Sequence, residues 1–133
     1  MSRENLDLVH RALQAYADGD IERMLSYLDP QAELYSAIIG GAEGKTYTGR
    51  AGIRDWFAET QVAFEDLSLE LTEFQDLGDR VVGLGRVHAR GRESGVELDS
   101  PTGWVFTVRA GKIVRAEGHL DPAVALDVGG LSE

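Results

Sequence analysis

The chain of 133 residues contains no cysteine. This absence excludes disulfide bonds, a thiol nucleophile and any metal site built on cysteine. Basic residues are scarce as well, because 13 lysines and arginines stand against 23 aspartates and glutamates, which gives a net charge of −10. Nucleic acids and anionic membranes are bound through basic surfaces, so neither is expected to be a partner.

Long apolar runs are also missing. No stretch approaches the roughly 20 apolar residues of a membrane-spanning helix. The first residues, charged from Arg3 onward, lack the apolar segment of a signal peptide. These absences lead us to expect a cytoplasmic protein. With 43% hydrophobic and 27% charged residues, the composition is typical of globular proteins, and the length predicts one domain over residues 1–133.

Helical spacing of apolar residues marks the first half of the chain. It predicts helices over residues 4–17, 21–28 and 51–64. A strand over residues 32–39 lies between the second and the third helix, and a glycine-rich loop at 40–44 follows it. The loop lacks the Gly-Lys-Ser/Thr ending of a phosphate-binding loop, so a plain surface loop is predicted there.

Alternation of apolar and polar residues marks the second half. This period of two predicts a strand over residues 66–74 and a meander of three strands between 78 and 122, with reversals at 90–95 and 109–112. A helical turn at 123–128 ends the pattern. Such an order predicts an α+β fold, in which helices cover one face of a curved, mainly antiparallel sheet.

Several segments resemble the nuclear transport factor 2-like superfamily, in particular its SnoaL-like and ketosteroid isomerase-like branch. The segments are YADGDIERMLSYLDPQAEL (16–34), TYTGRAGIRDWF (46–57), GDRVVGLGRV (78–87) and VFTVRAGKIVRAEGHLDPAVAL (105–126). Together with the order of the predicted elements, they extend the resemblance over nearly the whole chain.

The resemblance implies a cone-shaped, curved sheet, mixed or antiparallel, packed with three helices, also described as a cystatin-like α+β barrel. Residues 1–133 would form a single SnoaL-like domain with an apolar pocket at the wide end of the cone. The family generally uses neither a metal ion nor an organic cofactor, and it commonly forms homodimers, here expected through the sheet face. The fold serves isomerases, cyclases, hydrolases, dehydratases and non-enzymatic binders, so it does not fix the function.

The catalytic residues of known members are matched only in part. A ketosteroid isomerase has an aspartate base on the first strand, where residues 34–37 hold no carboxylate, and another aspartate where Trp104 stands. An epoxide hydrolase of the limonene type has an Arg-x-Asp pair, matched here by Arg86 and His88, and a further aspartate where Gly118 stands. No known catalytic set is therefore complete.

Strand alternation and the register of the family place one set of side chains inside the cone. Small residues such as Gly118 opposite an aromatic residue such as Trp104 are typical of a cavity wall. The predicted substrate-binding pocket consists of Tyr16, Tyr35, Trp56, Trp104, Phe106, Gly118 and Leu120. In the alternative interpretation, the aromatic residues simply fill the core and the tyrosine hydroxyls lie at its rim.

His88 and Arg86 are the candidate catalytic residues. They lie on one face of the first meander strand, so both would reach one substrate if that face points inward. A histidine with an unperturbed pKa of about 6.5 suits acid–base catalysis, and a neighbouring arginine favours its neutral form and can bind an enolate oxygen. If the face points outward, the same residues belong to a solvated basic stripe.

His119, Glu117 and Asp121 form a second polar group, on the last strand. One histidine and two carboxylates spread along a single strand are poorly placed to chelate a metal ion, so no metal site is predicted. The register of the family, carried over to this strand, implies that His119 and Glu117 lie on the outside of the cone. A salt-bridged face between two subunits is their expected use.

Two functions are compatible with this pattern. The first is a cofactor-independent acid–base enzyme, of the isomerase, cyclase, lyase or hydrolase type, acting on a small apolar carbonyl compound. The second is a non-catalytic binder of a small hydrophobic ligand, with the same pocket but no working catalytic set. A dimeric protein-interaction module is a third possibility, but it would need an exposed apolar face, which the charge-rich strands do not offer.

Overall fold

The structure is a computed structural model that describes residues 2–38 and 43–130. The expected glycine-rich loop at 40–44 therefore lies largely outside the described residues. The elements are α1 (Ser2–Ala17), α2 (Ile21–Ser26), β1 (Leu28–Ser36), β2 (Lys45–Thr48), α3 (Gly49–Ala63), β3 (Phe64–Asp76), β4 (Arg80–Gly91), β5 (Glu97–Arg109), β6 (Lys112–His119) and α4 (Pro122–Val128). None of the described helices is long and apolar enough to cross a membrane.

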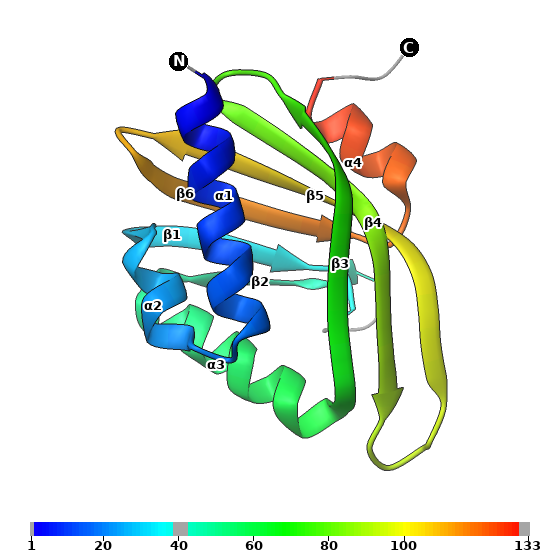
Figure 1. Ribbon diagram of the computed structural model, residues 1–133. Helices are drawn as coiled ribbons and strands as arrows, with labels where there is room; N and C mark the ends of the chain where they lie inside the picture. The colour runs from blue at the N-terminus through cyan, green and yellow to red at the C-terminus, as the bar shows by residue number, and fades with distance from the viewer. Residues whose placement is uncertain (1, 39–42, 131–133) are drawn as a thin grey trace.

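The six strands form one mixed sheet in the order β2-β1-β6-β5-β4-β3. Strands β1 and β6 are parallel, and the other neighbours are antiparallel. Figure 1 shows the strong curvature, with β3 and β4 at a steep angle to β1 and β2. The predicted α+β fold is confirmed, but the sheet does not close into a barrel, because β2 and β3 remain as edges.

The two faces of the sheet carry separate hydrophobic clusters. On the face that we call inner, α1, α2 and α3 pack over the sheet, and residues such as Val9, Ile53 and Phe106 form the main core. On the outer face, the short helix α4 covers Val82 and Val105. The fourth helix thus adds a small second core to the three-helix arrangement expected from the sequence.

The second helix is shorter than predicted. Its helical pattern extends to residue 28, but α2 ends at Ser26, and Leu28 already lies in β1 opposite Ile113 of β6. Pairing with β6 therefore overrides the local helical spacing. Pro30 fits into this strand because it falls within a register shift between Leu28 and Glu33, where a strand tolerates a missing N–H donor.

Irregular pairing bends the sheet where β3 meets β4. The register shifts between Glu65 and Ser68, where Asp66 has a positive φ of 57°, and shifts again between Leu71 and Glu73. Such bulges bend a strand and increase its twist. The bend brings the alternating leucines of β3 over the inner face, where they help to form the wall of a cavity.

Candidate functional site

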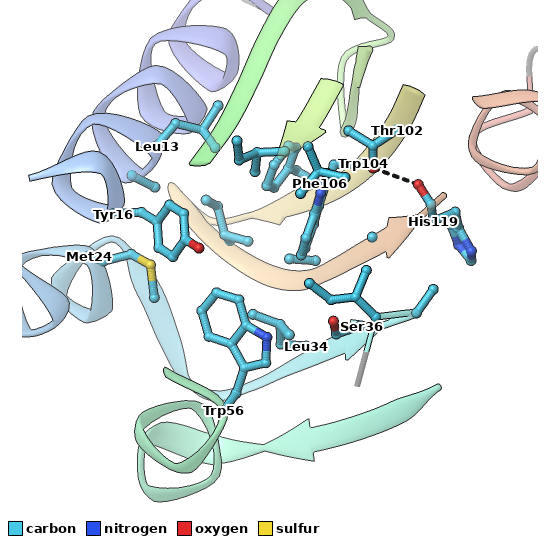
Figure 2. Close-up of a pocket in the computed structure, with 18 of the residues that line it drawn as sticks. Leu13, Tyr16, Met24, Leu34, Ser36, Trp56, Thr102, Trp104, Phe106 and His119 are labelled. Atoms are coloured by element: carbon cyan, nitrogen blue, oxygen red, sulfur yellow. Dashed lines mark hydrogen bonds between the residues drawn. The ribbon is translucent and has the colours of Figure 1, made fainter. Parts of the chain in front are cut away.

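A cavity lies between the inner face of the sheet and the helices α1, α2 and α3 (Figure 2). Its volume is about 70 Å³. The wall consists of Ala12, Leu13, Tyr16, Met24, Leu28, Leu34, Ser36, Ala37, Ile38, Trp56, Leu67, Leu69, Val87, Thr102, Trp104, Phe106, Ile113, Ala116, Gly118, His119 and Leu120. Among the described residues, this wall includes no aspartate, glutamate, lysine or arginine.

Two pairs of aromatic rings shape the cavity. Tyr16 of α1 stacks on Trp56 of α3, with ring centroids 5.6 Å apart, and Trp104 stacks on Phe106 of β5 at 6.0 Å. Trp104 lies directly over Gly118 of β6, because a Cβ atom at Gly118 would come within 2.3 Å of Cζ2 of the indole. The glycine therefore gives the Trp104 ring its place on the wall.

Neutral groups provide the polar side of the wall. Burial raises the pKa of Tyr16 to about 12, so its phenol stays protonated at neutral pH. The Thr102 hydroxyl donates a hydrogen bond to the His119 carbonyl oxygen at 2.6 Å. Trp56 is only 5% exposed, and its Nε1–H makes no hydrogen bond within the described part of the chain. Trp56 thus places an unpaired donor at the cavity.

His119 belongs to the wall, but its imidazole lies on the outer side of β6. Figure 2 shows the ring directed away from Trp104, and its centroid is 5.3 Å from that of Tyr35. The Nε2 atom is buried, lies 3.9 Å from Oε1 of Glu117 and makes no hydrogen bond to any described residue. Glu117 is in turn held by Arg115 Nε at 3.2 Å.

The described ranges contain no cluster of three histidine, aspartate or glutamate side chains arranged to hold a metal ion. The group formed by His119, Glu117 and Asp121 stays spread along one strand and its end. The prediction that no metal is bound remains a prediction. The same holds for the expected absence of an organic cofactor.

Six residues of the predicted pocket lie on the cavity wall: Tyr16, Trp56, Trp104, Phe106, Gly118 and Leu120. Tyr35 does not. Its neighbours Leu34 and Ser36 face the cavity, so alternation along β1 turns Tyr35 to the outer face, where its hydroxyl donates to the Glu43 carbonyl oxygen at 2.9 Å. The sequence prediction was wrong for this tyrosine, because the strand register was unknown.

Arg86 and His88 also point away from the cavity, so the prediction that both enter it is wrong. Val87 between them is buried in the cavity wall. Arg86 pairs with Asp99 at 3.0 Å, and the His88 imidazole lies 3.8 Å from Glu97, with 58% and 43% of the two side chains exposed. Both partners lie on β5, so Arg86 and Asp99 form an ion pair, and His88 lies beside Glu97, on the outer surface.

Several residues of the wall escaped the sequence analysis. Leu67 and Leu69 fall within the strand predicted over residues 66–74 but were not assigned to the pocket, which β3 reaches with the help of its bulges. Ser36 and Thr102, each 2% exposed, were also missed. For the orientation of β4, the sequence did contain a signal. One face of this strand carries no charged residue and the other carries all of the strand's arginines, which indicates that the uncharged face is the buried one.

Known structures share this fold. An NTF2-like protein of unknown function from Burkholderia pseudomallei K96243 is 21% identical, with a TM-score of 0.79 over 93% of this chain and 95% of its own. TerC, co-crystallised with polyporic acid, is 26% identical, with a TM-score of 0.77 and coverages of 96% and 98%. A putative SnoaL-like polyketide cyclase from Jannaschia sp. CCS1 is 18% identical, with a TM-score of 0.76 and coverages of 96% and 92%.

Comparison of the sequence with known families gives a more specific result than comparison of the structures. No curated protein matches the chain, but the SnoaL-like domain family matches residues 9–116. This range begins within α1 and ends within β6, so it includes all or part of the three helices and the five strands, β1 and β3 to β6, that line the cavity. The chain therefore belongs to the SnoaL-like domain family and has the NTF2-like fold.

Proposed function

We propose that the protein binds a small, uncharged and largely apolar molecule in the cavity. The observation that carries the proposal is the chemistry of the wall, which is apolar apart from a few neutral groups and includes no aspartate, glutamate, lysine or arginine among the described residues. An ion placed there would lose its hydration without meeting an opposite charge. Apolar surface, in contrast, gains about 25 cal/mol for every Å² buried.

The size of the cavity limits the ligand. Its volume of about 70 Å³ is far below the roughly 300–1,000 Å³ of pockets for drug-sized ligands, and even benzene has been accommodated in a cavity of about 150 Å³. A ligand of one ring is therefore near the upper limit of size, and it fits only when side chains such as Trp104 move outward. The likeness to TerC, which was crystallised with polyporic acid, supports a small organic molecule as the class of ligand.

A matched pair of substitutions on β6 tests this proposal. Ala116→Met inserts a long side chain into the cavity, whereas Val114→Met adds a similar bulk on the opposite face of the same strand. We expect Ala116→Met to weaken binding of benzene and cyclopentanone at least tenfold, and Val114→Met to leave both affinities unchanged. NMR titration of the native protein provides the reference. Absence of saturable binding of both probes to the native protein would overturn the proposal.

A cofactor-independent acid–base enzyme acting on a small apolar carbonyl compound is the second candidate. The observation that favours it is the His119–Glu117 pair, a histidine whose Nε2 atom makes no hydrogen bond to a described residue and lies beside a carboxylate. With the backbone at the end of β6 rearranged so that its side chain faces the cavity, His119 would remove a proton next to the carbonyl group, and the Tyr16 phenol would donate to the enolate oxygen.

Proton exchange separates the two candidates. An enzyme of this type accelerates the exchange of the α-protons of cyclopentanone for deuterium in D₂O, and His119→Gln slows this exchange. Proton NMR follows the loss of the signal. Exchange at the rate of the buffer alone, with cyclopentanone bound, would leave binding as the function and exclude this chemistry.

A homodimer through the sheet face is part of the same proposal. Glu33, Arg115 and Glu117 form a chain of ion pairs across β1 and β6 on the outer face, which supports a self-complementary contact between two copies. Analytical ultracentrifugation measures the assembly state. Arg115→Glu is expected to dissociate the dimer, and a monomeric native protein would contradict this part of the proposal.

A further inference from the structure

Trp56 combines burial with an unused hydrogen-bond donor. Its side chain comes from α3, stacks on Tyr16 of α1 and is 5% exposed, yet its Nε1–H has no partner within residues 2–38 and 43–130. A buried donor without an acceptor is unfavourable, because it has lost its hydrogen bond to water. A phenylalanine at this position would provide an aromatic ring without that cost, so packing alone does not account for the indole.

The surroundings of the indole specify what it can bind. Figure 2 shows Trp56 and the Tyr16 hydroxyl on the same side of the cavity. Both groups are donors, since the indole N–H only donates and the phenol is protonated at neutral pH. No carboxylate of the described chain lies on the wall to take these hydrogens. An acceptor on the ligand is the complementary group.

We propose that the Trp56 N–H donates to an oxygen of the ligand, so that the cavity selects a neutral carbonyl compound over a hydrocarbon of the same shape. A carboxylate would also accept this hydrogen bond, but the wall provides no lysine or arginine to balance its buried charge. Trp56 is then a specificity-determining residue. This inference rests on the proposed function, because it assumes that the ligand occupies the cavity.

Two probes of equal shape isolate the hydrogen bond. Cyclopentanone and methylenecyclopentane differ in one respect, an oxygen in place of a CH₂ group, so the ratio of their affinities reports on the acceptor. We expect Trp56→Phe, which keeps an aromatic ring but removes the N–H, to lower the ketone-to-alkene affinity ratio roughly two- to tenfold. Trp104→Phe removes the other indole of the same wall and is expected to keep the ratio, whatever its effect on both affinities.

A measurement on the native protein covers the case in which Trp56→Phe does not fold. The indole N–H groups of Trp56 and Trp104 give separate cross-peaks in a ¹H–¹⁵N spectrum, and Trp104→Phe assigns them. Cyclopentanone is expected to shift the Trp56 indole proton downfield, and methylenecyclopentane is expected to leave it closer to its original position.

The outcomes distinguish this inference from the proposed function. If neither probe binds the native protein, the proposed function fails and the inference fails with it. If both probes bind but the ketone produces no downfield shift, or the affinity ratio is the same in Trp56→Phe, the cavity is a binding site and Trp56 is not its donor. A trapped water that keeps the N–H occupied would give this second result.

Discussion

The two faces of strand β4 differ sharply in burial and charge. On the inner face, Val81, Val87 and Ala89 are buried, and Val87 lines the cavity. On the outer face of the same stretch, 58% of the Arg86 side chain and 43% of the His88 side chain are exposed, and both lie beside acids of β5. Adjacent residues of one strand therefore belong to an apolar binding surface and to a solvated ionic surface.

This difference shows what decides the orientation of an alternating strand. Both faces follow the same period of two, so alternation alone does not tell which one is buried. The free energy of burial decides which face is buried. Burying the arginine side chains would cost several kcal/mol for each unpaired charge, while burying valines is favourable. The uncharged face of β4 therefore packs toward the helices, even though the charged face carries the arginines and the histidine, which are the residue types suited to catalysis.

The largest effect is expected when one polar residue is introduced on each face in turn. Val87→Asn removes a buried apolar side chain and places an amide in an apolar wall, which we expect to lower the free energy of unfolding by about 2–4 kcal/mol. His88→Asn, one position further, changes an exposed residue and is expected to cost less than about 0.5 kcal/mol. Urea denaturation measures both. Equal losses in the two variants would contradict the assignment of the faces.

The inner face is also expected to show a distinct dependence on alkaline pH. Burial raises the pKa of Tyr16 from 10.0 to about 12, so between these values the unfolded chain loses the phenol proton while the folded chain retains it. Stability is unaffected by this group below pH 10 and falls by up to about 2–3 kcal/mol as the pH rises to 12. Denaturation at pH 8 and at pH 11.5 measures the loss.

Tyr16→Phe provides the control for this pH effect. The variant lacks the ionisable phenol but keeps the ring that stacks on Trp56. Other groups that titrate at high pH are the same in both proteins, so they cancel in the comparison. We expect the variant to lose less stability than the native protein between the two pH values, and an identical loss would show that Tyr16 is accessible to water.

A third effect concerns the contact of Trp104 with β6. Gly118→Ala brings a Cβ atom to within 2.3 Å of the indole, and such overpacking typically costs about 1–3 kcal/mol. In a Trp104→Leu background, the same substitution is expected to cost at least about 1 kcal/mol less, because the clashing ring is gone. A double-mutant cycle based on urea denaturation gives this coupling. Additive effects would mean that the two residues do not constrain each other.

The fold was predictable from the sequence because its signals are local. Helical spacing around α1 and α3, alternation along β3 to β6 and the glycines at the reversals each depend on neighbouring residues. The end of α2 was not predictable in this way. Leu28 fits the helical spacing equally well, and only its pairing with Ile113, 85 positions away, places it in a strand.

The candidate site was predictable in part. Trp104, Phe106, Gly118 and Leu120 lie on the cavity wall as expected, because the register implied by the family resemblance was used for β6. Counting from the reversal alone would have failed, since the pairing shifts by one residue between Thr107 and Val108. Tyr35 was not placed correctly, because β1 pairs with distant parts of the chain and its facing follows from that pairing. The unpaired Trp56 donor had no sequence signal at all, since a missing partner becomes visible only when every neighbour is in place.

The smallest effect is expected for the outer ion pair. Arg86→Ala breaks the contact with Asp99, but both side chains are more than half exposed, and exposed pairs contribute about 0–1 kcal/mol. The free energy of unfolding should fall by no more than this, and the affinity for cyclopentanone should not change, because Arg86 is separated from the cavity by the sheet. A tenfold weaker affinity in Arg86→Ala, at unchanged stability, would show that the outer face takes part in binding and would reverse the contrast between the two faces of β4.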